Sequence, residues 1–355
     1  MKPVPAVERV GIRRSHPATV SNVDRCSNMR VLVTGGAGFI GSHVVDELVK
    51  SGNRVVVYDN LSSGFREHLE AASATGLVTL VPGDILDTEA LVKAMEGAQT
   101  VYHLAANADV RGGCANTTVD LQQNVMGTHS VLEAMRRSGA SEIIFTSSAT
   151  VYGEPTVFPT PETYAPVQTS LYGASKLAAE AFIQAYEEYY GIRSYVFRFV
   201  SWIGERYSHG VVFDFINKLR DNPARLEILG DGNQKKSYLH VHDGIRGIFL
   251  AVERIKDRKN VINLGHREYV DVTRVARLVC EEMGLQDVEL HYTGGIRGWL
   301  GDSPFVHLDI SKLERIGFQP KIPIDEGIRR TVRYLLEHPA ILDARRKSLG
   351  GRSDA

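Results

Sequence analysis

The sequence of 355 residues has few cysteines and no long apolar run, and each of these features excludes a class of protein. Its three cysteines, Cys26, Cys114 and Cys280, lie far apart and form neither a disulfide framework nor a metal-binding spacing, so a reducing cytoplasm is the expected location. No stretch approaches the roughly 18 consecutive apolar residues of a membrane span. The net charge of -1 argues against nucleic acid or an anionic membrane as a partner.

The two ends of the chain differ in composition from its middle. Residues 1–28 contain three prolines, scattered charges and no apolar run, so we expect a disordered extension rather than a secretory signal. Met29 stands directly before the first predicted strand and is an alternative start of the protein. Residues 341–355 are polar and basic, and we expect them to form a frayed tail.

From Met29 onward, short apolar strands alternate with segments of helical periodicity. Strands are expected at residues 31–34, 54–58, 77–81, 100–104, 142–146 and 194–198, and helices at 42–50, 88–95, 119–137 and 170–190. This alternation predicts an α/β fold, with a doubly wound parallel sheet of the Rossmann type over residues 29–200. Residues 201–340 have more glycine, proline and isolated helices, and we expect them to form a smaller α/β substrate lobe at the carboxyl ends of the strands.

A glycine-rich turn follows the first predicted strand. Gly35, Gly38 and Gly41 have the spacing G-x-x-G-x-x-G, which lets the backbone approach a pyrophosphate at the N-terminus of the next helix. The turn lacks the Gly-Lys-Ser/Thr of a triphosphate-binding loop. Asp59 ends the second strand, where a carboxylate suits ribose hydroxyls and repels a 2′-phosphate, so NAD is favoured over NADP. Asp84, just past the third strand, is either an adenine contact or an ordinary turn residue.

A tyrosine and a lysine lie four residues apart on the longest predicted helix, at Tyr172 and Lys176. This spacing places them on the same face. Free tyrosine has a pKa of about 10 and is a poor base at neutral pH, but a nearby ammonium favours the phenolate. Ser148 follows the fifth predicted strand, where its hydroxyl can bond a substrate oxygen. The alternative is an exposed helix pair without function, against which Ser148 and the glycine-rich turn both argue.

Taken together, these motifs resemble those of the extended short-chain dehydrogenases/reductases, in the NAD-dependent epimerase/dehydratase family. The resemblance runs from about Met29 to Leu336 and is greatest to the UDP-glucose 4-epimerases. The matching segments are residues 33–43, 59–64, 83–84, 102–106, 124–128, 147–153, 172–176, 229–232, 238–241, 243, 297 and 301–302.

The resemblance implies an NAD-binding site made by the glycine-rich turn and the strand ends. The implied contacts are Gly35, Gly38, Phe39, Ile40, Gly41, Asp59, Asn60, Ser63, Gly64, Asp84, Ile85, Leu104, Ala105, Ala106, Asn124, Tyr172 and Lys176. It also implies that Tyr172 is the base, that Lys176 lowers its pKa, and that Ser148 positions the substrate. Asn124 would support the helix that carries the site. The implied reaction inverts C4 of a nucleotide-diphosphate sugar, of the UDP-glucose/UDP-galactose type, through a transient 4-keto intermediate.

The residues implied to bind the substrate depart from the usual pattern. They are Ser148, Ser201, Lys236, Arg297, Asp302 and Val306. Ser201 and Lys236 replace an expected asparagine and arginine, which leaves the nucleobase open, whereas Arg297 remains as the expected diphosphate clamp. Val306 takes the position that gates the sugar pocket and leaves room for an N-acetylated sugar. Ala149-Thr150 stands where related dehydratases carry Asp-Glu, which argues against dehydration.

Several alternatives stay open from the sequence. The chain is either a 4-epimerase, another nucleotide-sugar enzyme (a dehydratase, a reductase, or a C2- or C5-epimerase), or an NAD-binding regulatory protein without turnover. No metal is expected, because His240 and His242 have no further ligand nearby in the sequence. Cys114 is expected to fill space rather than to act as a nucleophile. By analogy, helices 119–137 and 170–190 are expected to form a four-helix bundle in a homodimer.

Overall fold

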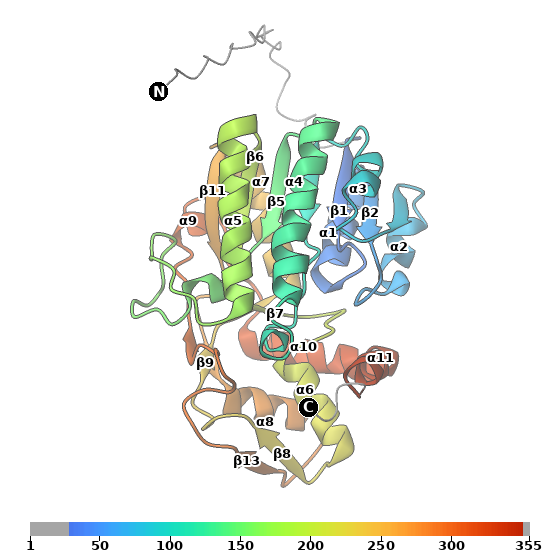
Figure 1. The fold of residues 1–355 in the computed structure, drawn as a ribbon. Helices are drawn as coiled ribbons and strands as arrows, with labels where there is room; N and C mark the ends of the chain where they lie inside the picture. The colour runs from blue at the N-terminus through green and yellow to red at the C-terminus, as the bar shows by residue number, and fades with distance from the viewer. Residues whose placement is uncertain (1–27, 351–355) are drawn as a thin grey trace, which may run out of the picture.

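A seven-stranded sheet lies at the centre of the molecule in the computed structural model, which describes residues 28–350 (Figure 1). The strand order is β11-β6-β5-β4-β1-β2-β3, and every pair of neighbours is parallel. The predicted doubly wound sheet is therefore confirmed. Its strands are β1 (Arg30–Thr34), β2 (Arg54–Asp59), β3 (Val78–Pro82), β4 (Thr100–His103), β5 (Glu142–Thr146), β6 (Arg193–Phe199) and β11 (Lys259–Leu264). The extension expected at residues 1–28 lies, apart from Asn28, outside the described residues.

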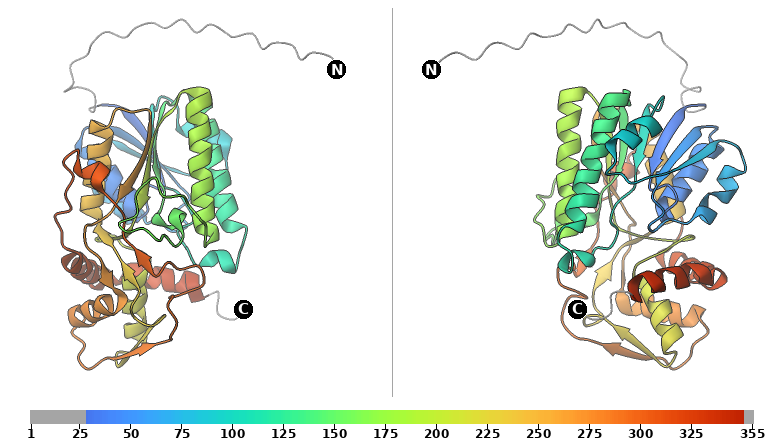
Figure 2. Two further views of the ribbon diagram at one scale, coloured as in Figure 1. Left: turned by 90° about the vertical axis from the view of Figure 1, so that its left-hand side faces the viewer. Right: turned by 45° about the vertical axis from the view of Figure 1, so that its right-hand side comes forward.

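Alternate side chains of each strand enter two hydrophobic clusters, one on each face of the sheet. In β1, Val31 and Val33 point into one cluster and Leu32 into the other. The face of Leu32 is covered by α3 (Thr88–Ala94), α4 (Gly127–Ser138) and α5 (Leu171–Tyr190), and the opposite face by α1 (Phe39–Lys50) and α7 (Val241–Arg254) (Figures 1 and 2). Because both faces are covered, most side chains in the central strands are apolar.

Local sequence fixes the ends of the helices that carry the site. Ser170 caps the N-terminus of α5, where its Oγ accepts a hydrogen bond from the Gly173 N–H at 3.1 Å. The same helix ends at Gly191, whose φ of 72° is the left-handed conformation that glycine adopts without strain. Tyr172 is thereby held in the first turn of α5, at the carboxyl end of the sheet.

Three elements differ from what the sequence predicts. Strand β11 and helix α7 follow residue 200, yet they complete the sheet and its helical layer, so the chain returns to the nucleotide-binding half after leaving it. The helix expected at 119–137 starts with a π-helical turn, η3 (Leu121–Met126), before α4 begins. The extra residue in that turn changes the direction in which the Asn124 side chain points, as described below.

The remaining residues form a smaller lobe at the carboxyl ends of the strands, below the sheet in Figure 1. Its helices and strands are α6 (Val211–Asp221), α8 (Val272–Glu282), α10 (Ile324–Glu337), α11 (Pro339–Gly350), β7 (Ser201–Ile203), β8 (Arg225–Ile228), β9 (Lys235–Lys236), β10 (Tyr238–His240), β12 (Val270–Asp271), β13 (Glu289–Tyr292) and β14 (Phe305–Val306). The short turns η1 (Arg66–Leu69), α2 (Glu70–Ser73), η2 (Gly112–Cys114), η4 (Ala149–Tyr152) and α9 (Ser311–Glu314) complete the described elements.

Helix α11 forms where a frayed tail was expected. Its residues Ile341 and Leu342 are buried, and this apolar anchor orders the start of the segment. Residues 351–355 lie outside the described part of the chain. Within residues 28–350, no helix has both the length and the apolarity needed to cross a bilayer.

Candidate active site

The strand order creates a crevice between β1 and β4. These strands are neighbours, but the chain continues from β1 toward β2 at one side and from β4 toward β5 at the other. Ligands of doubly wound sheets bind at this switch point, beyond the carboxyl ends of the strands. Here a cavity of about 910 Å3 is lined by residues of both the sheet and the lobe, a size suited to a large ligand.

The glycine-rich turn packs against the residues that follow β4 in a way that only glycine permits. A Cβ at Gly35, whose φ is 69°, would lie 2.7 Å from the Ala105 nitrogen, and one at Gly41 would lie 2.1 Å from the Gly35 oxygen. Helix α1 begins after Gly38 with no side-chain cap, and the first residues of the helix line the cavity. Uncapped N–H groups and the positive end of the helix dipole suit a pyrophosphate. The residues present therefore fit a dinucleotide.

Asp59 is buried at the end of β2 and organises the loops around the cavity. One carboxylate oxygen accepts a hydrogen bond from the Ala37 N–H at 2.9 Å and the other from the Leu61 N–H at 2.8 Å. A carboxylate has further lone pairs, so these bonds leave acceptors for ribose hydroxyls. The other predicted cofactor contacts that line the cavity are Gly35, Gly38, Phe39, Ile40, Gly41, Asn60, Ser63, Ile85, Leu104, Ala105, Ala106, Tyr172 and Lys176.

Three of the predicted cofactor contacts do not line the cavity. Gly64 packs against the glycine-rich turn, since a Cβ there would lie 2.8 Å from the Ala37 Cβ. Asp84 is exposed and accepts a hydrogen bond from the Leu86 N–H at 2.9 Å, as a turn residue does, and its contact with adenine stays a prediction. Asn124 is buried, as expected for a residue that supports the site.

The three predicted catalytic residues lie together on the wall of the cavity. The Ser148 side chain lies close enough to Tyr172 to lower the pKa of the tyrosine. Its Oγ accepts hydrogen bonds from the Thr150 N–H at 3.2 Å and the Thr150 hydroxyl at 2.9 Å. Because Thr150 occupies both lone pairs, the Ser148 proton is left to donate to the Tyr172 oxygen or to a substrate oxygen.

The pKa of Tyr172 differs from the sequence-based expectation. Burial raises it above the usual value and the charge of Asp120 raises it further, while the hydrogen bond from Ser148 lowers it. The Lys176 ammonium donates to the Thr146 carbonyl at 3.0 Å and lies 5.9 Å from the centre of the Tyr172 ring. Burial also lowers the pKa of Lys176 itself to about 8, so its charge is sensitive to mildly alkaline pH.

A chain of buried polar groups joins the glycine-rich turn to α5. His103 connects Thr34 and Thr128, with N···O distances of 2.7 and 3.0 Å. The Thr128 hydroxyl donates to the Asn124 carbonyl at 2.6 Å, and the Asn124 amide donates to the Ser175 hydroxyl at 2.9 Å. The π-helical turn η3 gives Asn124 this orientation. The chain fixes α5, and hence Tyr172, relative to the cofactor loop.

The residues predicted to bind the substrate separate into two groups. Four line the lobe side of the cavity: Ser201, Lys236, Asp302 and Val306. The Lys236 ammonium pairs with Asp302 at 2.5 Å, which holds a cation at the wall. Arg297 does not line the cavity, and its guanidinium pairs with Glu154 at 2.8 Å. The role of Arg297 as a diphosphate clamp therefore stays a prediction.

Some residues of the cavity wall were not predicted from the sequence. Arg111, in the loop after β4, forms an ion pair with Asp214 of α6 at 3.1 Å. Tyr207 and Trp299 also line the wall from the lobe. Arg111 and Asp214 are 103 residues apart in the sequence, so no local spacing signals their ion pair. Cys114 is exposed in η2 and is not part of the lining.

Comparison with known proteins agrees with this geometry. Residues 31–265 match the model of the NAD dependent epimerase/dehydratase family. The chain is 31% identical to UDP-glucose 4-epimerase of Mycolicibacterium smegmatis, over 86% of the chain and 98% of that protein. It is also 31% identical to UDP-glucuronic acid decarboxylase 1 of Arabidopsis thaliana, over 86% of the chain and 69% of that protein.

Solved structures show the same range of activities on one fold. UDP-glucose 4-epimerase of Thermotoga maritima, solved with UDP-glucose, has a TM-score of 0.79 and 34% identity, covering 88% of the chain and all of that structure. The dTDP-glucose 4,6-dehydratase DesIV of Streptomyces venezuelae, solved with NAD, has a TM-score of 0.82 and 27% identity, covering 88% and 98%. The cavity, the glycine-rich turn and these matches lead to one conclusion: the chain belongs to the NAD-dependent epimerase/dehydratase family of nucleotide-sugar enzymes, and NAD is the cofactor of that family.

Proposed function

We propose that the chain inverts the configuration at C4 of a nucleotide-diphosphate hexose through a transient 4-keto sugar. The observation that carries the proposal is the group formed by Ser148, Tyr172 and Lys176 on the wall of one cavity with the glycine-rich turn. A base next to a cofactor-sized crevice suits oxidation of a carbinol. NAD, when bound, supplies the acceptor and then the donor of the hydride.

The residues of the chain provide the proton chemistry. Ser148 donates a hydrogen bond to the reacting hydroxyl and Tyr172 takes its proton, while the buried Lys176 places a positive charge beside the phenolate as it forms. Inversion also requires the keto sugar to present its other face. A wide cavity with the small Val306 on its wall gives the sugar room to turn. As the hydride returns to C4, Tyr172 gives its proton back to the C4 oxygen.

The positions after Ser148 favour epimerisation over dehydration. Elimination of water needs a general acid beside the leaving hydroxyl. Here Ala149 offers only a methyl group, and the Thr150 hydroxyl is bonded to Ser148 at 2.9 Å. Other conversions of a nucleotide sugar within the family are the alternative, and the identity of the product separates them from epimerisation.

The experiment is a screen for epimer exchange. Purified protein is incubated separately with UDP-, dTDP-, GDP- and CDP-hexoses, and the products are identified by NMR. We expect C4 epimers from at least one nucleotide series, without net consumption of NADH. Tyr172→Phe should abolish exchange and still bind NAD, because it removes the base and leaves the cofactor wall intact. Loss of water, loss of carbon dioxide or a net redox change would support the alternative, and normal turnover by Tyr172→Phe would remove the assigned base.

A further inference from the structure

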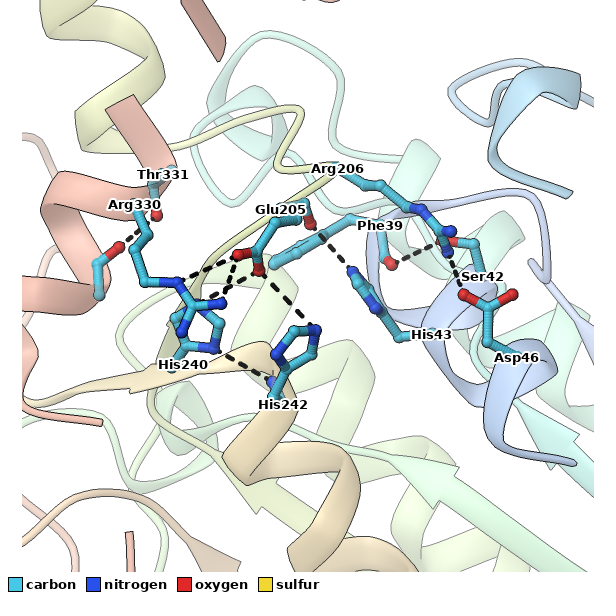
Figure 3. A network of polar contacts seen from close by, with 11 residues as sticks. Phe39, Ser42, His43, Asp46, Glu205, Arg206, His240, His242, Arg330 and Thr331 are labelled. Carbon is cyan, nitrogen blue, oxygen red and sulfur yellow. Dashed lines mark hydrogen bonds and ion pairs between the residues drawn. The ribbon is translucent and has the colours of Figure 1, made fainter. Parts of the chain in front are cut away.

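A cluster of charged and imidazole side chains lies outside the cavity lining, where the lobe meets α1 (Figure 3). Glu205 comes from the loop after β7, His240 ends β10, and His242 lies in the first turn of α7. The expectation that the two histidines lack a further ligand is wrong, because the fold brings Glu205 to them from 35 residues earlier in the chain. Sequence spacing gives no sign of this approach.

The ligand atoms have the separation that a small metal ion requires. One Glu205 oxygen, Oε2, lies 3.3 Å from His240 Nε2 and 3.8 Å from His242 Nε2, and one atom of each residue falls within 4.8 Å of the others. Zinc bonds of about 2.0–2.2 Å in a tetrahedron put ligand atoms about 3.3 Å apart. The separation of Glu205 and His240 already matches this value, whereas the His242 nitrogen must move closer for all three side chains to share one ion.

Two of these atoms are buried next to each other. Glu205 Oε2 and His240 Nε2 are inaccessible to solvent and face each other at 3.3 Å, but neither makes a hydrogen bond of acceptable geometry. The other carboxylate oxygen is satisfied by Arg330, at 2.7 Å. Buried polar atoms without partners are costly and usually have a functional reason. An ion between Oε2 and Nε2 would satisfy both.

We propose that Glu205, His240 and His242 form a binding site for a divalent transition-metal ion of the zinc type. Two imidazoles and one carboxylate match the preference of zinc, whereas calcium and magnesium prefer oxygen ligands alone. The His242 side chain is 51% exposed, which gives an ion access from solvent and leaves a fourth position for water. The site is separate from the nucleotide-sugar cavity.

The surroundings permit binding but limit its strength. Burial lowers the pKa of His43, which adjoins the cluster, to about 3, and also lowers the pKa of His242, so neither is cationic at neutral pH. Two features oppose the ion. Arg330 brings a positive charge, and His240 Nδ1 accepts a hydrogen bond from the His242 N–H at 3.3 Å, which must be lost when the ring proton moves to Nδ1. The affinity should be below that of a closed structural zinc site.

Binding at this site would join three parts of the fold. The His43 ring, in α1, is hydrogen-bonded to the Glu205 carbonyl at 3.0 Å, two residues beyond the last glycine of the cofactor loop. An ion held by Glu205 and the two histidines would therefore link α1, the loop after β7 and the start of α7. Because the ion would bind the folded chain, it should raise the melting temperature.

The test measures ion binding directly and does not depend on any sugar activity. Full-length protein without a polyhistidine tag is stripped with a chelator, kept under a non-chelating reductant, and titrated with Zn2+ and Co2+. Calorimetry gives affinity and stoichiometry, thermal unfolding gives stabilisation, and visible absorption of Co2+ reports its ligands. We expect one ion per chain, a raised melting temperature and a tetrahedral Co2+ spectrum.

The variants separate this site from adventitious binding. His242→Ala, which removes a half-exposed side chain and should leave the fold intact, and Glu205→Gln should each weaken binding by more than about tenfold. His338→Ala, which removes an exposed histidine elsewhere, should bind as the parent does. Equal affinity in the parent and His242→Ala, or no Zn2+-dependent stabilisation of the parent, would overturn the proposal.

Discussion

His103 illustrates how one buried side chain connects the cofactor loop with the catalytic helix. It lies on β4, is 1% exposed, and bridges Thr34 and Thr128. Burial lowers its pKa to about 3. The ring is therefore neutral, with one nitrogen donating and the other accepting, and protonation would turn an acceptor into a donor at a buried site.

This pKa predicts how stability depends on pH. The unfolded chain binds a proton at its ordinary pKa of 6.5 and the folded chain only near 3, so between these values the unfolded state holds more protons. The free energy of unfolding should fall as the pH is lowered through this window, by up to about 1.4 kcal/mol per pH unit from this group. His103→Gln, which cannot titrate, should show a shallower slope in urea unfolding between pH 7 and 5. An unchanged slope would show that His103 does not contribute.

Single residues were predictable from the sequence where a local rule places them. Ser148 follows a strand, and Tyr172 and Lys176 share a helix face. The closeness of these three side chains therefore follows from topology and periodicity. The direction of Arg297 was not predictable, because a carboxylate 143 residues away, on Glu154, decides it. The pKa of Tyr172 also depends on burial, which spacing does not report.

Among the elements, the π-helical turn η3 shows what periodicity leaves out. Apolar spacing places a helix at residues 119–137, but the extra residue in the turn is favoured by tertiary bonds. The side-chain oxygen Oδ1 of Asn124 accepts a hydrogen bond from the Asn107 N–H at 2.8 Å, and the side-chain Nδ2 donates to the Ser175 hydroxyl in α5. Such turns are frequent at functional sites. Strand β11 was missed for a related reason, because its place beside β6 is set by packing.

The short strand β14 leads to a prediction on substrate size. Val306 pairs with Lys236 of β9 and lines the cavity, so a larger side chain there would occupy the space around the sugar. If the chain is a 4-epimerase, Val306→Tyr should abolish turnover of N-acetylated hexoses and spare plain hexoses. Steady-state rates on both substrates measure this.

A matched control lies one residue away. The Phe305 ring packs on Phe158, with ring centres 4.3 Å apart, and does not line the main cavity. Phe305→Tyr should therefore leave the ratio of the two rates unchanged. Equal loss of both activities in Val306→Tyr would contradict a gate at this position.

At the scale of the whole molecule, α4 and α5 run side by side on the outer surface of the sheet half (Figures 1 and 2). Apolar side chains are exposed on this surface and at its lower end, namely Leu121, Met126, Phe182, Tyr189 and Tyr190. Exposed apolar side chains gathered on one surface often mark an interface. Pairing of the same face across a twofold axis would produce a four-helix bundle.

We therefore expect a homodimer that depends on this surface. Phe182→Asp should shift the protein toward the monomer, because it would bury a charge on each side of the twofold axis. Leu336→Asp, at an exposed apolar position on α10, is the control and should remain dimeric. Light scattering after gel filtration measures the mass. A dimer that survives Phe182→Asp would place the interface elsewhere.

The central claim is tested most directly with a substrate that carries deuterium at C4. The substrate is the best one from the nucleotide-sugar screen. If one hydride leaves C4 and returns to the same carbon, the epimer formed in ordinary water keeps its deuterium at C4, and Tyr172→Phe forms no epimer. NMR and mass spectrometry of the product follow the label. An epimer whose C4 deuterium has been replaced by hydrogen from solvent, or a product that has lost water or carbon dioxide, would contradict the account.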